Sequence, residues 1–273
     1  MKNLEETALD IRRKIIKAAW RGKAGLVSSA MSIVEIITVL YFDLMRYDSQ
    51  NPGWPERDRF ILSKGHGSLA LYAALNKTGF LSDELLDTFC LPNSILGAHP
   101  ERCISGVEAS TGSLGHGLSL AVGIALAGKM DRKDYKTYVI LGDGECQEGS
   151  VWEAFLTIPA WELTNLITVI DCNRLQGSET DRHTLLMYPL KNKLEAFGFD
   201  VTEINGHDMS AVKSALTAPV SEGKPKLILA DTLKGKGLSC MENKPDWHGR
   251  VPNAAEMESV IADLAINRKE VGL

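Results

Sequence analysis

The sequence predicts an α/β fold with a mostly parallel sheet and helices on both of its faces. Three short segments, 137–141, 166–170 and 226–230, consist mainly of apolar residues, as do the strands of parallel sheets that are buried on both faces. Helical patterns separate the strands in the second half of the chain, and this alternation is typical of a parallel sheet. The 273 residues are 44 % apolar and 24 % charged, which fits a single globular domain over residues 1–273.

The N-terminal half is expected to be largely helical. Residues 1–20 have the pattern of an amphipathic helix, with one apolar face formed by Leu4, Ala8, Ile11, Ile15 and Ala19. The elements expected after it are a buried helix over 31–42 with Ser32 near its start, a loop at 51–55, a short strand at 59–63, a helix at 67–75, a loop at 92–110 and a Gly- and Ala-rich helix at 114–130.

The C-terminal half alternates strands and helices. The expected order is a strand at 137–141, a helix at 149–161, a strand at 166–170, a helix at 190–197, a strand at 200–204, a helix at 209–216 and a strand at 226–230. Open sheets of this kind bind ligands at the carboxyl ends of their strands. The residues that directly follow each strand are therefore the first candidates for a functional site.

Composition excludes several classes of protein. Thirty Lys and Arg residues against 35 Asp and Glu residues give a net charge of -5, so no basic excess indicates a nucleic acid or an anionic membrane as partner. The N-terminus carries charges throughout, unlike a signal peptide, and no run approaches the ~18 apolar residues of a membrane span. Five cysteines without metal-binding spacing are predicted to be reduced. These features indicate a cytoplasmic protein.

Two turns at the ends of neighbouring strands carry oxygen ligands. Gly142-Asp143-Gly144-Glu145 follows one strand, and Asp171-Cys172-Asn173 follows the next. Asp143 and Asn173 would offer a carboxylate and an amide oxygen to one point, which suits Mg²⁺ that keeps water and phosphate oxygens as further ligands. The alternative for either turn alone is an ordinary strand-end turn. Residues 142–147 do not form the GxGxxG motif of dinucleotide sites, and residues 232–237 lack the spacing of a P-loop.

The order of motifs along the chain resembles that of the transketolases. The match covers nearly the whole chain, and it is to the N-terminal, diphosphate-binding half of the family, as found in split transketolases. The motifs that carry the resemblance are Ser63-Lys64-Gly65-His66-Gly67, Gly97-Ala98-His99-Pro100, Thr111-Gly112-Ser113-Leu114-Gly115-His116-Gly117, the GDGE turn at 142–145, Glu148-Gly149-Ser150-Val151-Trp152-Glu153, Lys234-Gly235-Lys236-Gly237 and Trp247-His248-Gly249.

This resemblance implies thiamine diphosphate and Mg²⁺ as cofactors. The implied metal ligands are Asp143, Asn173 and the Leu175 carbonyl group. Glu148 and Glu153 match an acidic pair that lies at the interface between subunits in the family. The implied cofactor contacts are His66, Gly112, Ser113, Leu114, His116, Gly144, Glu145, Glu148 and Asn173.

Three histidines are the implied catalytic residues, namely His66, His99 and His248. They match family positions near the cofactor or the sugar oxygens, and an imidazole can move protons near neutral pH. His116 stands where many relatives have glutamine. His183 and His207 lie in loop-like contexts and are expected to be surface residues. The implied reaction transfers a two-carbon ketol unit from a ketose phosphate to an aldose acceptor.

Departures from the family pattern leave alternatives open. Leu26 occupies the place of a substrate-contacting histidine, and a leucine cannot form a hydrogen bond to a sugar hydroxyl. A specialised ketol transferase for a branched or sulfonated sugar is therefore one alternative, and a non-catalytic binding or regulatory protein is another. The family's pyrimidine-binding and C-terminal domains have no counterpart here, so the chain is expected to need a partner, the C-terminal transketolase subunit, in an assembly that is a pair of pairs.

Overall fold

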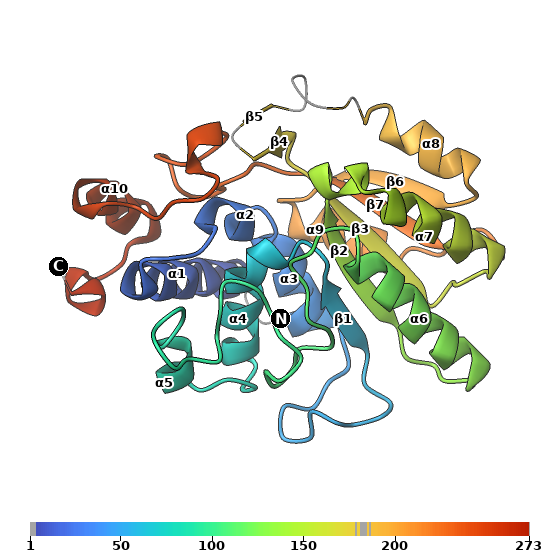
Figure 1. Cartoon of the computed structure of the whole chain (residues 1–273), viewed down its shortest axis with the longest axis horizontal. Helices are drawn as coiled ribbons and strands as arrows, with labels where there is room; N and C mark the ends of the chain where they lie inside the picture. The colour runs from blue at the N-terminus through green and yellow to red at the C-terminus, as the bar shows by residue number, and fades with distance from the viewer. Residues whose placement is uncertain (1–3, 178, 181–184, 186, 273) are drawn as a thin grey trace.

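Five parallel strands form the central sheet of the computed structural model, which describes residues 4–177, 179–180, 185 and 187–272. The sheet order is β1-β2-β3-β7-β6, and every neighbouring pair is parallel. The predicted α/β class and the mostly parallel sheet are confirmed (Figure 1). The strands are β1 (Arg59–Leu62), β2 (Thr137–Gly142), β3 (Leu166–Cys172), β6 (Asp200–Asn205) and β7 (Lys226–Asp231), and a separate antiparallel pair consists of β4 (Leu175–Gln176) and β5 (Glu179–Thr180).

Helices cover both faces of this sheet because its strands are apolar on both sides. Successive strand residues point to opposite faces, so Ile140 packs into one core cluster while Val139 and Leu141 pack into the other. The first cluster includes α1 (Leu4–Gly22), α2 (Val27–Met31), α3 (Val34–Val39), α4 (Ser68–Lys77), α9 (Met209–Thr217) and α10 (Ala254–Leu264). The second includes α6 (Gly117–Met130), α7 (Gly149–Ala160) and α8 (Leu190–Ala196).

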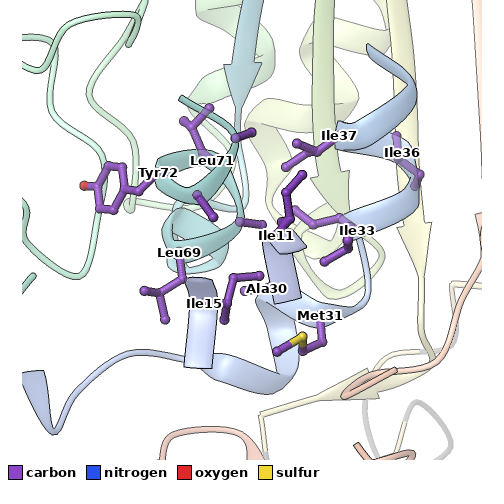
Figure 2. Close-up of a cluster of buried hydrophobic side chains, with 14 of the residues drawn as sticks. Ile11, Ile15, Ala30, Met31, Ile33, Ile36, Ile37, Leu69, Leu71 and Tyr72 are labelled. Carbon is purple, nitrogen blue, oxygen red and sulfur yellow. The ribbon is translucent and has the colours of Figure 1, made fainter. Parts of the chain in front are cut away.

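The N-terminal helix α1 buries the apolar face that its spacing predicts. Ala8, Ile11, Ile15 and Ala19 are buried, and Leu4 is partly buried at the start of the helix. Figure 2 shows Ile11 and Ile15 in one cluster with side chains of the segments 30–37 and 69–72. The long N-terminal helix is thus held by hydrophobic burial.

The single helix predicted over residues 31–42 is wrong. The segment is broken into α2 and α3, followed by a π-helical turn at Leu40–Leu44. Ser32 lies at the break, where its hydroxyl is within hydrogen-bond distance of both the Ser29 carbonyl oxygen and the Asp171 carboxylate. A serine hydroxyl that bonds to the preceding turn competes with helical hydrogen bonding. The break brings Ser32 to the carboxyl edge of the sheet.

Several short elements were not predicted. They are α5 (Asp83–Leu86), the small pair β4–β5, and α10 near the C-terminus. Helix α10 begins with a capping box in which Asn253 and Glu256 bond to each other's backbone N–H groups, a signal that the sequence does contain. No helix among the described residues is both long and apolar enough to cross a membrane. All five cysteines are free thiols, as predicted, and Cys146 and Cys172 are buried.

The register of the strands brings their carboxyl ends to one edge. Gly142 is opposite Asp171, and Cys172 is opposite Asp231. The turns that follow β2 and β3 are therefore side by side, as their sequences predicted. This edge is where the polar residues of the candidate site gather.

Candidate functional site

A cavity of about 380 Å³ opens at the carboxyl edge of the sheet. It is lined by residues from turns after β1, β2 and β3 and from the segments around 26–29, 99, 114, 234 and 248. The structure therefore brings together most of the residues singled out from the sequence. Those on the cavity wall are His66, His99, Leu114, Asp143, Gly144, Glu145, Asn173, Leu175 and His248.

Asp143 is a buried carboxylate that accepts hydrogen bonds from two backbone donors. Its Oδ1 accepts from the Gly144 N–H at 2.9 Å, and its Oδ2 accepts from the Arg174 N–H at 2.7 Å. No cationic side chain among the described residues forms an ion pair with it. Burial and the neighbouring Asp171 carboxylate raise the pKa of Asp143 to about 6. A buried carboxylate without a cationic partner fits a site for a bound cation.

Asn173 and Leu175 complete an oxygen donor set beside Asp143. The Asn173 Nδ2 group donates to Asp171 Oδ2 at 3.0 Å, and its Oδ1 accepts from the Leu175 N–H at 3.1 Å. One carboxylate, one amide oxygen and the Leu175 main chain on the same wall fit Mg²⁺ that also takes phosphate and water oxygens. The described residues contain no group of three or more His, Cys, Asp or Glu side chains that would hold a metal by themselves. The residues therefore fit a metal whose coordination is completed by a phosphate ligand.

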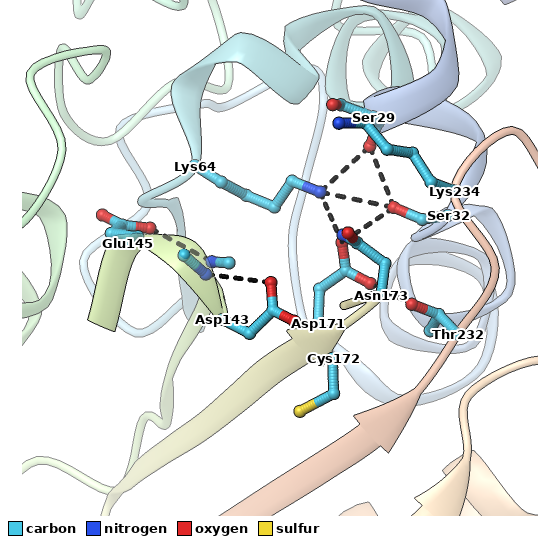
Figure 3. A network of polar contacts seen from close by, with 12 residues as sticks. Ser29, Ser32, Lys64, Asp143, Glu145, Asp171, Cys172, Asn173, Thr232 and Lys234 are labelled. Carbon is cyan, nitrogen blue, oxygen red and sulfur yellow. Dashed lines mark hydrogen bonds and ion pairs between the residues drawn. The ribbon is translucent and has the colours of Figure 1, made fainter. Parts of the chain in front are cut away.

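Lys64 and Asp171 form an ion pair underneath this donor set (Figure 3). Their side chains are 1 % and 0 % exposed, respectively. Burial alone would raise the pKa of Asp171, but Lys64 and the hydroxyls of Thr232 and Ser32 hold this pKa below its ordinary value. Asp171 is therefore an ionised carboxylate that serves as a buried acceptor. It was part of the predicted turn but was not chosen as a site residue.

Glu145 lines the cavity, but both of its carboxylate oxygens already accept hydrogen bonds from other groups of the chain. Its Oε1 accepts from the Ser63 hydroxyl and from the Gly115 N–H, and its Oε2 accepts from the Gly142 N–H. Burial raises the pKa of Glu145. The side chain therefore connects the turn after β1, the 111–117 loop and the end of β2 by hydrogen bonds. These contacts stabilise the wall of the cavity.

Two histidines and a lysine form the polar side of the cavity. The ring centroids of His66 and His248 are 6.1 Å apart, and Lys234 Nζ lies 2.8 Å from His248 Nδ1. Burial and the charge of Lys64 lower the pKa of His66 to about 3, and burial and Lys234 also lower the pKa of His248. Both rings are therefore neutral near pH 7. An ammonium at Lys234 donates to His248 Nδ1, which leaves the proton on Nε2 of that ring.

Lys234 is a site residue that sequence reasoning did not select. Burial and the charge of Lys64 lower the pKa of Lys234 to about 8. The KGKG motif could have indicated this lysine, because its first glycine has a structural requirement. Gly235 has φ +81, and a Cβ there would lie 2.8 Å from the Met241 backbone. Only glycine fits this turn without strain, and the turn places the preceding lysine in the cavity. Ser29 also lines the cavity without having been selected.

The remaining predicted residues lie beside the cavity or at its mouth. His99 is exposed, and a Cβ at Gly112 would lie 2.8 Å from the His99 ring, so the glycine lets that ring approach. Ser113 and His116 are exposed in a second hollow of about 620 Å³ that His99 also borders. Glu148 and Glu153 are exposed and line neither hollow. Four of the predicted cofactor contacts therefore do not line the cavity that contains the donor set, namely Gly112, Ser113, His116 and Glu148.

His207 is not a surface residue, and that prediction is wrong. Its side chain is 11 % exposed, and its Nδ1 lies 3.0 Å from Glu35 Oε2. The Leu233 N–H donates to its Nε2 at 2.7 Å. These contacts connect α3 to the segment that leads into Lys234. His183 lies outside the described residues.

The fold and the site define a class of protein. An oxygen donor set with one carboxylate at the carboxyl edge of a parallel sheet, beside neutral histidines and a lysine, is typical of a domain that binds a phosphorylated cofactor. The family model described as "Transketolase, thiamine diphosphate binding domain" matches residues 5–271. The chain belongs to the transketolase family of transferases and corresponds to the family's N-terminal part.

Relatives of two lengths match the chain. It is 41 % identical over 255 residues to one subunit of the apulose-4-phosphate transketolase of Phocaeicola vulgatus, covering 93 % of this chain and 91 % of that one. It is also 41 % identical over 264 residues to a 6-deoxy-6-sulfo-D-fructose transketolase subunit of a Clostridium species, covering 96 % of each chain. The human transketolase is 37 % identical over 264 residues, and the match spans 42 % of that protein.

Solved transketolases have the same fold. The structure of the Leishmania mexicana enzyme matches with a TM-score of 0.91 at 31 % identity, and the match covers 98 % of this chain and 42 % of that one. The Campylobacter jejuni enzyme matches with a TM-score of 0.92 at 31 % identity, over 98 % of this chain and 43 % of that one. The chain thus spans less than half of the length of the transketolases whose structures it matches.

Proposed function

We propose that this chain is the N-terminal subunit of a split, thiamine diphosphate-dependent transketolase and that residues 1–273 form one cofactor-binding domain. Asp143, Asn173 and the Leu175 carbonyl group would hold Mg²⁺, which in turn would hold the diphosphate beside Gly144. Thiamine diphosphate, when bound, supplies a nucleophilic carbon that adds to the carbonyl group of a ketose. The observation that carries the proposal is the buried Asp143, without an ion pair among the described residues, in a cavity with Asn173 and two neutral histidines.

The residues of this chain would position the substrate and move protons. The neutral rings of His66 and His248 can donate or accept a hydrogen bond, and the Nε2–H of His248 is a donor for a sugar oxygen. His99 stands at the mouth of the same cavity. Lys234 adds one positive charge against the negative charge of a diphosphate.

The proposed partner is a C-terminal transketolase subunit with the pyrimidine-binding and C-terminal domains. Support comes from two relatives that are named as subunits of a transketolase, because this chain matches them over more than nine-tenths of their length. The substrates would be sugar phosphates. We place the assembly in the cytoplasm, which agrees with five free thiols.

Recovery of the assembly from its own host tests this function. We expect the tagged chain, isolated with its partner, to move a ketol unit between a ketose phosphate and an aldose in the presence of thiamine diphosphate and Mg²⁺. The chain separated from the partner is expected to be inactive. Turnover at the same rate by the isolated chain would contradict the need for a partner. An assembly without cofactor or activity would favour a binding or regulatory protein instead.

The charge of Lys234 predicts a pH dependence of cofactor binding. Its pKa of about 8 lies below the ordinary lysine value, so the free site loses this charge as pH rises through that value. We expect the affinity for thiamine diphosphate to fall by up to about tenfold per pH unit above that point. Isothermal titration calorimetry across this range measures the slope. The folding stability of the chain without cofactor has the opposite pH dependence. Protonated Lys234 costs stability because its pKa is lowered in the folded chain, so stability is expected to rise as pH increases from about 8 toward the ordinary lysine pKa.

Substitutions of the two lysines in the KGKG motif distinguish the pH dependence caused by Lys234 from the effect of removing any positive charge near the site. Lys234→Met is expected to remove the slope and to weaken binding at neutral pH. Lys236 is paired with Glu242 and does not line the cavity, so Lys236→Met is the matched control and should keep the slope. A slope that persists in Lys234→Met would assign the pH dependence to another group.

A modified sugar is the second candidate substrate, and Leu26 favours it. Leu26 lines the cavity with His66, His99 and His248, so an apolar side chain stands among the groups that would contact the sugar. Two relatives of matching length are named for apulose-4-phosphate and for 6-deoxy-6-sulfo-D-fructose. We propose that the sugar accepted by this chain lacks a hydroxyl group, or carries a substituent, where it meets Leu26.

Leu26→His is expected to change sugar preference. An added hydrogen bond contributes about 0.5–1.5 kcal/mol, so the ratio of kcat/KM for an unmodified ketose phosphate to that for the preferred sugar should rise by about two- to tenfold. Steady-state kinetics with a panel of sugar phosphates measures the ratio, and Leu26→Met is the apolar control. An unchanged ratio would show that Leu26 does not contact the sugar.

A further inference from the structure

We propose that Asp171 is a positioning residue that fixes which end of the Asn173 amide faces the metal site. This inference rests on the proposed function, because it concerns a ligand of the proposed Mg²⁺. An amide group has an oxygen and an NH₂ group of nearly the same shape, and only the oxygen can bind a cation. Some contact must therefore select one of two orientations.

The contacts of Asn173 make that selection. Its Nδ2 donates to Asp171 Oδ2 at 3.0 Å, and its Oδ1 accepts from the Leu175 N–H at 3.1 Å. Turning the amide by half a rotation would place the NH₂ group against the Leu175 N–H and the oxygen against the Asp171 carboxylate. Both hydrogen bonds would be lost and replaced by unfavourable contacts. The observed orientation leaves the amide oxygen on the side of Leu175, in the cavity wall.

Asp171 can impose this orientation because it acts only as an acceptor. Four segments of the chain donate to its two oxygens: Lys64 and Ser32 donate to Oδ2, Thr232 donates to Oδ1, and Asn173 donates to Oδ2 as described above (Figure 3). The carboxylate is therefore ionised and fixed, with 0 % of its side chain exposed. A neutral amide in its place could present its NH₂ group to Asn173, and then only the Leu175 N–H would favour the observed orientation.

A merely structural role for Asp171 makes a different prediction from a positioning role. As a structural partner of Lys64, it would affect stability, and its loss would affect metal binding equally whatever residue stands at position 173. As a positioning residue, it matters only when the side chain at 173 has two unlike ends. An aspartate at 173 has two equivalent oxygens and needs no orientation.

A double-mutant cycle on the recovered assembly tests this difference. Mg²⁺ is titrated in saturating thiamine diphosphate, and the Mg²⁺ concentration at half-saturation is measured by calorimetry, beside the thermal unfolding midpoint. Asp171→Asn is expected to raise that concentration about 10- to 100-fold, as loss of a residue that orients a metal ligand does. In an Asn173→Asp background, the same substitution is not expected to raise it, because the Asp171 carboxylate would face a second carboxylate at position 173 and an amide at 171 can donate to that carboxylate instead. The loss of one negative charge is common to both backgrounds.

Thr232→Val is the matched control, because it removes a donor to Asp171 Oδ1 without changing the bond to Asn173. It is expected to lower the unfolding midpoint but to leave Mg²⁺ binding within about threefold.

If Asp171→Asn does not fold, the double variant that exchanges the two residues, Asp171→Asn with Asn173→Asp, tests the inference instead. The exchange keeps one carboxylate and the hydrogen bond between the two positions, so Mg²⁺ binding within about threefold of the unmodified assembly supports the inference. Binding more than about tenfold weaker overturns it.

The outcomes separate this inference from the function on which it rests. Equal effects of Asp171→Asn in the two backgrounds would overturn the positioning role while leaving the Mg²⁺ site intact. Failure of the unmodified assembly to bind thiamine diphosphate in a Mg²⁺-dependent way would overturn the proposed function, and the positioning role with it.

Discussion

Asp143→Ala is expected to abolish Mg²⁺-dependent binding of thiamine diphosphate. Asp143 is the only carboxylate of the proposed donor set, and its removal leaves an amide and a carbonyl oxygen. The loss of affinity should exceed about 100-fold, because even residues that only orient a metal ligand cost about 10- to 100-fold when they are replaced. Calorimetric titration of the recovered assembly with thiamine diphosphate, with and without Mg²⁺, measures this loss.

The unliganded chain should still fold without this carboxylate. Asp143 is bonded to the two backbone groups of Gly144 and Arg174 and has no ion pair among the described residues. Asp231 is the matched control, since it is an exposed carboxylate at the same edge of the sheet. Asp231→Ala should bind the cofactor normally. Equal binding by Asp143→Ala and the unmodified assembly would refute the metal assignment.

Lys64→Met is expected to cost about 3–5 kcal/mol of unfolding free energy, the largest stability effect in the site. The substitution leaves the Asp171 carboxylate buried without its cation, and removal of one partner from a buried ion pair typically has a cost of about this size. The midpoint of urea unfolding, measured on the chain without cofactor, is expected to fall accordingly.

A surface pair provides the comparison for this substitution. Lys213 pairs with Asp43 at 2.8 Å, and its side chain is 52 % exposed. Lys213→Met should change the unfolding free energy by less than about 1 kcal/mol, as is usual for exposed ion pairs. Similar midpoints for the two variants would mean that water reaches Asp171 and that the pair is not buried.

Local sequence patterns predicted the sheet well because its strands are short and apolar. The strand at 137–141 and the strand at 166–170 each lie within one residue or two of an observed strand. The helix over 31–42 failed for a tertiary reason. Ser32 forms hydrogen bonds to Asp171, a residue far away in the sequence, and no local pattern reports that contact. Helix α10 was missed although its capping box was readable.

The candidate site was predictable to the extent that its residues follow strands. Asp143 and Asn173 were found in this way, and their common location follows from the pairing of β2 with β3. Lys64, Asp171 and Lys234 were not selected, because a buried charge looks like a surface charge in a sequence. Their roles depend on burial and on partners from distant segments. Glu148 was selected from its motif as an interface residue, and in this chain it is exposed and does not line the cavity.

Native mass spectrometry of the assembly recovered from its host tests the central claim most directly. The claim is that this chain binds thiamine diphosphate through Mg²⁺ at Asp143 and Asn173 and works with a second subunit. We expect a hetero-oligomer whose mass includes thiamine diphosphate and Mg²⁺, and we expect the cofactor mass to be absent when the chain carries Asp143→Ala. A complex of this chain with itself alone, free of cofactor under saturating thiamine diphosphate and Mg²⁺, would contradict the claim.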